Sequence, residues 1–149
     1  MKILSQRDPA WAADKLGAST LTIGRFGCTT TCISMLSDYF GCYKSPLEIA
    51  HNASNYTPDG LVVWSRLMFA RMQFVRRDRT FDAAAIADSI KDPNKAVMLE
   101  VNNGQHWVVA IRKTLFGNDY FVADPWTGKK VGAKAAYHNI TGAAYFKRA

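Results

Sequence analysis

The stretch GRFGCTTTCISMLSDYFG, residues 24–41, joins a Gly-x-x-Gly turn to a helical pattern. From its first cysteine onward, residues at i, i+4, i+7 and i+8 share one face of a helix over residues 28–39, namely Cys28, Cys32, Met35 and Leu36. Gly41 ends this helix. The pattern therefore places Cys28 in a first helical turn, where unpaired backbone N–H groups favour a negative charge.

The sequence around this stretch predicts further helices in the first part of the chain. Residues 20–27 are expected to be a short extended segment that ends in the glycine turn. Ser45-Pro46-Leu47-Glu48 is a capping box with proline at the first helical position, and it predicts a helix to about Ala53. Two more helices are expected over residues 61–72 and over residues 83–90, the latter with Asp82 as its N-cap.

Strand patterns dominate the second part of the chain. Runs rich in β-branched and aromatic residues, separated by turn residues, occupy residues 74–77, 96–101, 106–112, 120–123 and 143–147. The middle three are expected to form an antiparallel meander. The fold class predicted from the pattern is therefore α+β, with N-terminal helices packed on a small C-terminal antiparallel sheet.

Length and composition are typical of one globular domain spanning residues 1–149. Of the 149 residues, 48% are apolar and 21% are charged, which excludes a disordered tail, a collagen-like chain and a coiled coil. No segment is long and apolar enough for a membrane span, and the opening MKILSQRDPAW lacks the apolar region of a secretory signal. We therefore expect a cytoplasmic protein, or one released or particle-associated without a signal peptide.

The net charge of +7 lies wholly in the second part of the chain, because residues 1–60 carry five basic and five acidic residues. Residues 61–149 carry fourteen basic and seven acidic residues, which fits either an anionic partner surface or an ordinary solvated surface. Arginines and aromatic residues alternate between Trp64 and Arg79, as in a nucleic-acid stacking groove. The favoured interpretation is a buried aromatic stripe with solvated arginines, and a nucleic-acid partner is not expected.

Three residues are placed for nucleophilic chemistry: Cys28, His106 and Asp124. His106 begins one predicted strand and Asp124 ends the next, and these two ends meet in an antiparallel pair. An imidazole beside the thiol lowers the pKa of the thiol and can carry its proton, and a carboxylate on the second ring nitrogen orients the imidazole. A Cys–His–Asp set therefore forms if the helix packs against this edge of the sheet.

The remaining cysteines and histidines are assigned structural or surface roles. The three cysteines are odd in number and clustered, which argues against a disulfide framework, and Cys32 and Cys42 are expected to be small core residues. Cys28 and Cys32 could form half of a metal site, but no second pair with ligand spacing accompanies them. No metal or cofactor is expected, and His51 and His138 are interpreted as structural or exposed.

An ordered set of short motifs resembles the peptidase-39-like cysteine peptidases, the superfamily of the double-glycine leader peptidases. Gln6-Arg7-Asp8-Pro9-Ala10-Trp11 is similar to the family's Q-x-D-x-x-W opening. The resemblance covers about residues 3–128 and continues, in the family's order, through Leu16-Gly17, Thr22-Ile23-Gly24, Gly27-Cys28, Thr31, Met35, Gly41, Pro46, His106-Trp107-Val108-Val109 and Asp124-Pro125.

The resemblance implies a papain-like fold and a role for each matching residue. Cys28 would be the nucleophile, His106 the general base and acid, and Asp124 the residue that orients His106. Gln6 would donate an N–H to the oxyanion hole. One departure concerns the nucleophile motif, where Thr29 and Thr30 replace the family's usual glycine and proline and could narrow the cleft.

The leading functional hypothesis is a stand-alone cysteine peptidase or amide hydrolase that acts through an acyl-thioester. Its substrate would be a protein or the stem peptide of peptidoglycan, as for a processing protease or a phage-encoded lysin. A basic second part would suit an anionic cell envelope. The alternative is a papain-like binding or particle-structural module with a weak or inactive site.

Overall fold

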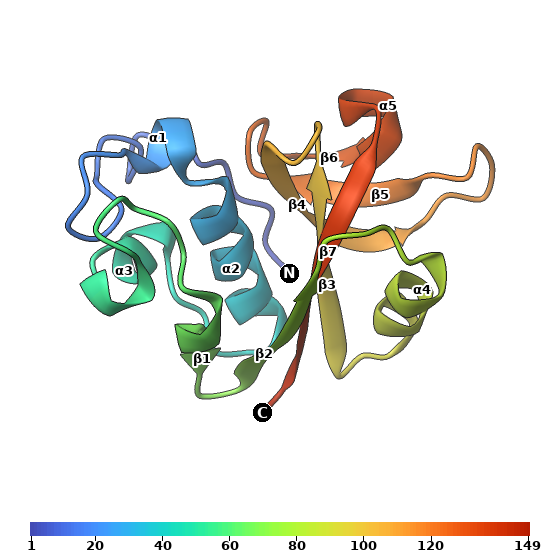
Figure 1. Ribbon diagram of the computed structural model, residues 1–149, viewed down its shortest axis with the longest axis horizontal. Helices are drawn as coiled ribbons and strands as arrows, with labels where there is room; N and C mark the ends of the chain where they lie inside the picture. Colours follow the sequence, from blue (N-terminus) through green and yellow to red (C-terminus); the bar gives the residue numbers. More distant parts are fainter.

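The computed structural model describes residues 1–149 and has five α-helices, two single turns of 3₁₀ helix and a seven-stranded sheet (Figure 1). The predicted α+β class is confirmed at this level. In chain order, the elements are α1 (Ile23–Phe26), α2 (Cys28–Tyr39), α3 (Pro46–Ala50), η1 (Ala53–Asn55), η2 (Trp64–Arg66), β1 (Met68–Phe69), β2 (Met72–Asp78), α4 (Ala83–Lys91), β3 (Lys95–Val101), β4 (His106–Lys113), β5 (Tyr120–Asp124), β6 (Lys129–Gly132), α5 (Ala133–Tyr137) and β7 (Ile140–Arg148).

The sheet is antiparallel throughout, with strand order β1-β2-β7-β3-β4-β5-β6. Strands β3 to β6 form a meander, as predicted for its first three strands. The last strand, β7, does not extend that meander but lies between β2 and β3, so the end of the chain joins the two parts of the sheet. The sheet is larger than the small C-terminal one expected.

Helices cover both faces of the sheet, and each face has its own apolar core. On one face, α2 packs Ile33 and Leu36 against residues such as Trp107 and Val109 of β4. On the other face, Ile86 of α4 and residues of α5 pack against Val97, Leu99 and Val108, whose positions alternate with those of the first core. Figure 1 shows α1 to α3 on the left of the sheet, with α4 and α5 on the right and top.

Local sequence signals placed several helices correctly. The predicted helix over residues 28–39 is α2. The capping box at α3 is present, because the Glu48 N–H donates to Ser45 Oγ at 3.2 Å and the Ser45 N–H donates to Glu48 Oε2 at 2.8 Å. Asp82 caps α4 through the Ala85 N–H at 3.0 Å. Helix α3 ends at Ala50, however, a few residues before the predicted end at Ala53.

The helix expected over residues 61–72 is wrong. The chain there forms η2 and β1 instead, because its backbone groups bond to the preceding segment: Val62 pairs with Tyr56 in an isolated bridge, and the Val63 N–H donates to the Asn55 carbonyl at 2.8 Å. The apolar residues of this segment also do not share one buried face, since Leu67 is buried whereas Leu61 is 65% exposed.

The extended segment expected before Cys28 is also partly wrong, because residues 23–26 form the short helix α1. Backbone bonds to the N-terminal segment fix its start: the N–H groups of Ile23 and Gly24 donate to the carbonyls of Asp14 and Ala12 at 2.8 and 2.9 Å. The strand β6 and the helix α5 have no counterpart among the predicted elements.

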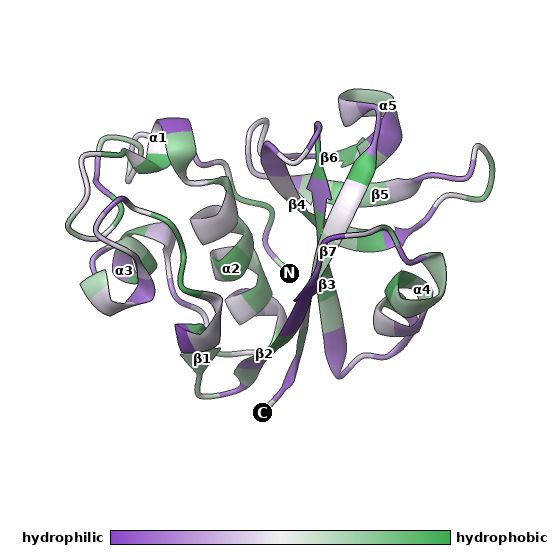
Figure 2. Cartoon of the chain, viewed as in Figure 1, coloured by the Kyte–Doolittle hydropathy of each residue, from purple (hydrophilic) through white to green (hydrophobic).

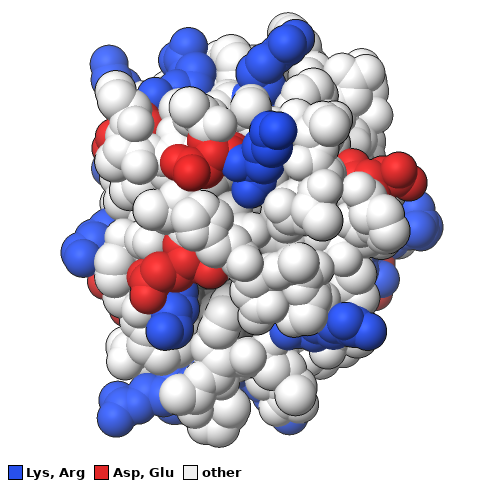
Figure 3. All heavy atoms as spheres, turned by 90° about the vertical axis from the view of Figure 1, so that its left-hand side faces the viewer, with Lys and Arg blue, Asp and Glu red and all other residues white.

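The aromatic residues among the arginines pack inward, as the favoured interpretation expects. Trp64 lies 5.1 Å from Trp107 and 5.6 Å from Phe74 between ring centroids. Arg77 departs from the expectation of solvated arginines, because it is half-buried and forms an ion pair with Glu100 at 2.7 Å. Figure 3, which faces the α1–α3 side, shows Lys and Arg side chains interspersed with Asp and Glu. None of the helices combines the length and the hydropathy needed to cross a membrane.

Candidate active site

Cys28 is the first residue of α2, and two glycines of the opening stretch bring it there. A Cβ on Gly27 would lie 2.5 Å from the Ile23 carbonyl oxygen, so only glycine fits where α1 turns into α2. A Cβ on Gly24 would lie 3.0 Å from the Ala12 carbonyl oxygen. These close approaches hold the Cys28 thiol at the N-terminus of a 12-residue helix, where the backbone favours a thiolate.

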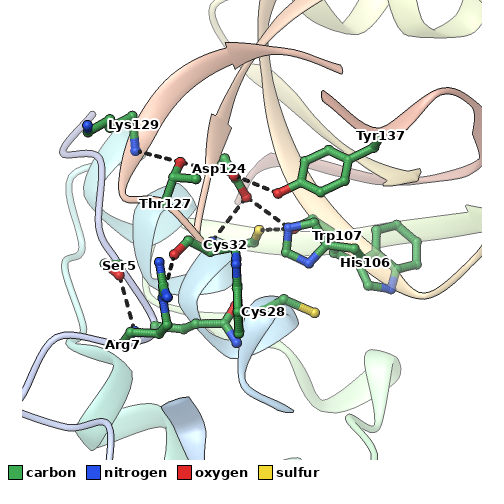
Figure 4. A network of polar contacts seen from close by, with 12 residues as sticks. Ser5, Arg7, Cys28, Cys32, His106, Trp107, Asp124, Thr127, Lys129 and Tyr137 are labelled. Atoms are coloured by element: carbon green, nitrogen blue, oxygen red, sulfur yellow. Dashed lines mark hydrogen bonds and ion pairs between the residues drawn. The ribbon is translucent and has the colours of Figure 1, made fainter. Parts of the chain in front are cut away.

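His106 and Asp124 meet at one end of the β4–β5 pair, as the antiparallel geometry predicts. His106 begins β4 and Asp124 ends β5, and the His106 Nε2–H donates to Asp124 Oδ1 at 2.8 Å. Since Nε2 is bonded to the carboxylate, Nδ1 is the ring nitrogen that remains for Cys28. Helix α2 packs on β4 and brings the Cys28 thiol beside this imidazole (Figure 4).

Asp124 is fully buried and accepts hydrogen bonds from four groups. Its Oδ1 accepts from His106 and from the Trp126 N–H at 3.0 Å, while Oδ2 accepts from the hydroxyls of Thr127 at 3.0 Å and Tyr137 at 2.7 Å (Figure 4). Burial alone would raise the pKa of the carboxyl group, but these donors outweigh burial and hold it below its ordinary value. Asp124 is therefore an ionised, immobile acceptor for His106.

Sequence reasoning missed Tyr137, which lies on the unpredicted helix α5. Its ring centroid is 4.8 Å from that of His106, and its hydroxyl holds Asp124. The position of α5 depends on the buried Asp119, whose carboxylate accepts the N–H groups of Lys134 and Ala135 at 2.8 and 3.1 Å. No local spacing signals this contact, because it joins residues that only the sheet brings together.

The thiol and the imidazole shift each other's ionisation. Burial raises the pKa of the Cys28 thiol, but hydrogen bonding to His106 and its positive charge, with smaller contributions from Trp107 and Thr29, outweigh burial and lower it. Burial lowers the pKa of His106, whereas Asp124 and Cys28 together raise it to about 9. Between these two values the site holds a thiolate–imidazolium ion pair.

Gln6 also reaches this site, although it lies far away in the chain. Its side chain is buried, and its backbone N–H donates to the Pro125 carbonyl at 2.8 Å, directly beside Asp124. Its Nε2 donates to the Gly24 carbonyl at 3.2 Å, and its Oε1 has no hydrogen-bond partner. One N–H of the amide is therefore committed to Gly24, and the second remains for an oxyanion.

A cleft of about 340 Å³ opens over Gln6, Cys28 and His106. Its other walls come from α1, the β3–β4 loop, the turn after β5 and α5, which contribute Arg25, Phe26, Asn102, Gln105, Trp126 and Tyr137. The two threonines of the nucleophile motif do not line it. The Thr30 hydroxyl is buried against the Tyr56 hydroxyl at 2.8 Å, and Thr29 Oγ1 lies 4.0 Å from the Cys28 sulfur.

The other cysteines and histidines lie outside the cleft. Cys32 is fully buried and donates to the Trp107 carbonyl at 3.3 Å, and burial raises the pKa of its thiol well above the ordinary value. Cys42 is half-buried against the core. His51 is exposed and lies 3.4 Å from Asp14 Oδ1, and His138 is exposed after α5. No group of three or more His, Cys, Asp or Glu side chains is placed to hold a metal ion.

Comparisons with protein-family models, with curated proteins and with solved structures each found no match.

The ion pair predicts a specific pH dependence for the alkylation of Cys28. The rate with iodoacetamide should rise with a midpoint below the ordinary thiol pKa of 9.0 and change again near pH 9, where His106 loses its proton. Peptide mass spectrometry measures the rate for each cysteine, and the buried Cys32, which should stay unreactive across this range, is the internal control. In His106→Ala the Cys28 midpoint should rise. A wild-type midpoint at or above 9.0 would contradict the ion pair.

Proposed function

We propose that this chain is a cysteine peptidase or amide hydrolase of the peptidase-39-like, papain-like type. The observation that carries the proposal is a thiol at a helix N-terminus, beside an imidazole whose second nitrogen is bonded to a buried carboxylate at 2.8 Å. A cysteine that only fills space in the core, or a histidine that only faces solvent, would not require this arrangement. The packing of α2 on an antiparallel sheet supports the papain-like assignment that the sequence resemblance implies.

The geometry supports a two-step reaction. The Cys28 thiolate attacks the amide carbonyl carbon, and the resulting oxyanion is stabilised by the free N–H of Gln6 and the Cys28 backbone N–H. The His106 imidazolium then gives its proton to the leaving amine as the C–N bond breaks, which leaves a thioester on Cys28. In the second step, His106 takes a proton from water, the hydroxide oxygen bonds to the thioester carbonyl, and Cys28 leaves as the thiolate.

The substrate class we propose is a peptide, either within a protein or in the stem of peptidoglycan. The open cleft suits an extended chain, and Arg25 places a cation on its wall. A processing protease and a phage-encoded lysin remain the two settings that fit this chemistry. The competing hypothesis, a binding or particle-structural module with an inactive site, is less well supported because all four expected side chains lie together.

Two substrates and one variant test the proposal. The protein is incubated with denatured casein and, separately, with purified peptidoglycan. Newly released amino groups are counted, and mass spectrometry of the intact protein detects an acyl adduct on Cys28. Release of amino groups from either substrate by wild type, and not by Cys28→Ala, is the expected result. Rapid alkylation of Cys28 with no release and no adduct on either substrate would favour the binding module instead.

The Gln6 amide should contribute to turnover rather than to substrate binding. Gln6→Ala is expected to lower kcat by on the order of 10²–10³-fold, the scale for removal of one oxyanion donor, with little change in KM. Gln105→Ala is the matched control, because Gln105 lines the same cleft but bonds to none of the reacting groups. Steady-state kinetics on the cleaved peptide separates the two constants. A change confined to KM would remove Gln6 from the oxyanion hole.

A further inference from the structure

The β4–β5 hairpin ends in two large apolar side chains that nothing in the chain covers. Leu115 is 87% exposed and Phe116 is 89% exposed, well above the other exposed large apolar residues. Figure 1 shows this hairpin projecting at the right of the molecule, and Figure 2 shows its tip as hydrophobic. Burying such side chains removes apolar surface from water, so the exposed pair can supply binding energy to a partner.

The tip is held in place by its own hydrogen bonds. The Thr114 N–H donates to the Asp119 carbonyl at 2.9 Å, and the Asp119 N–H donates back to the Thr114 hydroxyl at 3.1 Å. Gly117 turns the chain with a φ of +83°, and a Cβ there would meet nothing within 4 Å. Leu115 and Phe116 are therefore presented outward on a closed loop.

Cationic side chains surround the base of this tip. We call them the basic collar: Arg112, Lys113, Lys130 and Lys134. Arg112 and Lys130 both lie over the Phe121 ring, at 4.4 and 5.2 Å from its centroid, and Lys134 Nζ donates to the Asn118 carbonyl at 3.0 Å.

No carboxylate neutralises the basic collar, since none of its members forms an ion pair. The nearest acid in the chain, Asp119, is buried and accepts three backbone N–H groups from Tyr120, Lys134 and Ala135. The exposed Asp82 caps α4 next to Phe81, whose ring contacts Lys134. The basic excess noted in residues 61–149 is thus concentrated in part around an apolar tip.

An apolar tip above a set of unpaired cations matches the chemistry of a lipid interface. Leu115 and Phe116 follow Lys113 in the closed loop at the end of the hairpin, and both are almost fully exposed, so they stand out beyond the collar. Interfacial segments insert about 5–10 Å into the boundary between headgroups and acyl chains. A protein partner of standard size covers about 800 Å² on each side, whereas two side chains on a narrow turn offer a point contact.

We propose that the hairpin tip and the basic collar bind the surface of an anionic lipid bilayer. Leu115 and Phe116 enter the boundary between headgroups and acyl chains, and the four cations of the collar bind the anionic headgroups. His106 stands at the opposite end of β4 from Lys113, about 23 Å away along the strand at 3.3 Å per residue. The cleft thus stays clear of the bilayer. This inference does not depend on the proposed catalytic function.

Vesicle sedimentation tests the proposal on the full chain. Wild type is expected to bind vesicles of phosphatidylcholine and phosphatidylglycerol at 3:1, to bind pure phosphatidylcholine much more weakly, and to dissociate at high salt. Leu115→Ser/Phe116→Ser should weaken the binding more than tenfold. Arg112→Gln/Lys113→Gln should weaken it about 10- to 30-fold, since each cation near an anionic surface contributes about 1 kcal/mol.

The matched control is Leu61→Ser/Met68→Ser, because these two side chains are each 65% exposed elsewhere on the molecule. This variant should bind vesicles as wild type does, and thermal unfolding confirms that every variant is folded. Equal binding by the tip variant and wild type would overturn the proposal. So would equal affinity for neutral vesicles. Retention on duplex DNA or on peptidoglycan, as strong as vesicle binding and equal for wild type and the tip variant, would also overturn the proposal. The collar would then bind a polyanion rather than a bilayer.

Discussion

Replacing Cys28 by alanine is expected to abolish amide hydrolysis while leaving the fold intact. In the proposed mechanism the thiolate forms the only covalent bond to the substrate, so its loss should lower kcat by on the order of 10⁶-fold, the scale seen when a hydrolase loses its nucleophile. The side chain is small and half-buried at the start of α2, so the unfolding midpoint should hardly move. Cleavage of a peptide substrate and chemical denaturation measure the two effects.

Three further variants separate the nucleophile from a merely structural thiol. Cys28→Ser keeps the size of the side chain but should also be inactive, because a hydroxyl does not ionise beside His106 as a thiol does. Cys42→Ala should retain activity, since α2 spans about 18 Å between the two cysteines. Cys32→Ala is the control for a core cysteine: it should lower the free energy of unfolding, because its buried sulfur bonds to the Trp107 carbonyl. Unchanged turnover in Cys28→Ala would exclude the proposed mechanism.

Replacing Asp124 by alanine is expected to affect both stability and activity. The buried carboxylate accepts from His106, Thr127, Tyr137 and the Trp126 N–H, and its removal leaves these donors without an acceptor. Loss of one partner from a buried charged pair costs about 3–5 kcal/mol in the free energy of unfolding. Alkylation of Cys28 should also slow near neutral pH, because His106 loses both its orientation and the interaction that raises its pKa.

Asp124→Asn is the matched control for this prediction. An asparagine oxygen can still accept from His106 and from the Trp126 N–H, while its amide N–H groups can donate to the hydroxyls of Thr127 and Tyr137. We therefore expect a smaller loss of stability and of Cys28 reactivity than in Asp124→Ala. The turnover of Asp124→Ala should still exceed that of His106→Ala, because orientation contributes less than proton transfer. Negligible losses in both alanine variants would contradict the Cys–His–Asp set.

The pH dependence of stability gives a second test of the same pair. The pKa of Asp124 is below its ordinary 3.8 and that of His106 is raised from 6.5 to about 9. The stabilisation from Asp124 is thus present above pH 3.8 and fades as the pH falls through its lowered pKa. The stabilisation from His106 is full below pH 6.5 and fades as the pH rises through about 9. The difference in unfolding free energy between wild type and Asp124→Ala should therefore be largest between pH 3.8 and pH 6.5, and it should shrink as the pH rises from 6.5 to about 9.

Features that depend on neighbours in the chain were predictable from the sequence. Helical periodicity and the glycine turn placed Cys28 at the start of α2, and the β-branched and aromatic runs of two consecutive strands placed His106 and Asp124 at adjoining strand ends. Capping residues located the starts of α3 and α4. These signals act within a few residues or across one hairpin, where backbone geometry leaves few alternatives.

Only the tertiary structure decided the features that depend on distant partners. Residues 61–72 have helical apolar spacing, yet bonds to Tyr56 and Asn55 hold them in other conformations. Strand β7 lies between β2 and β3, and Tyr137 reaches Asp124 only because α5 rests on Asp119. The exposure of Leu115 and Phe116 likewise follows from where the hairpin projects, since periodicity does not report which apolar residues find a partner. The sequence by itself thus determined which residues could form the Cys–His–Asp set. Long-range contacts determined which residues surround and hold that set, and which apolar residues stay exposed. Those contacts join segments that are far apart in the chain, so no local spacing in the sequence predicts them.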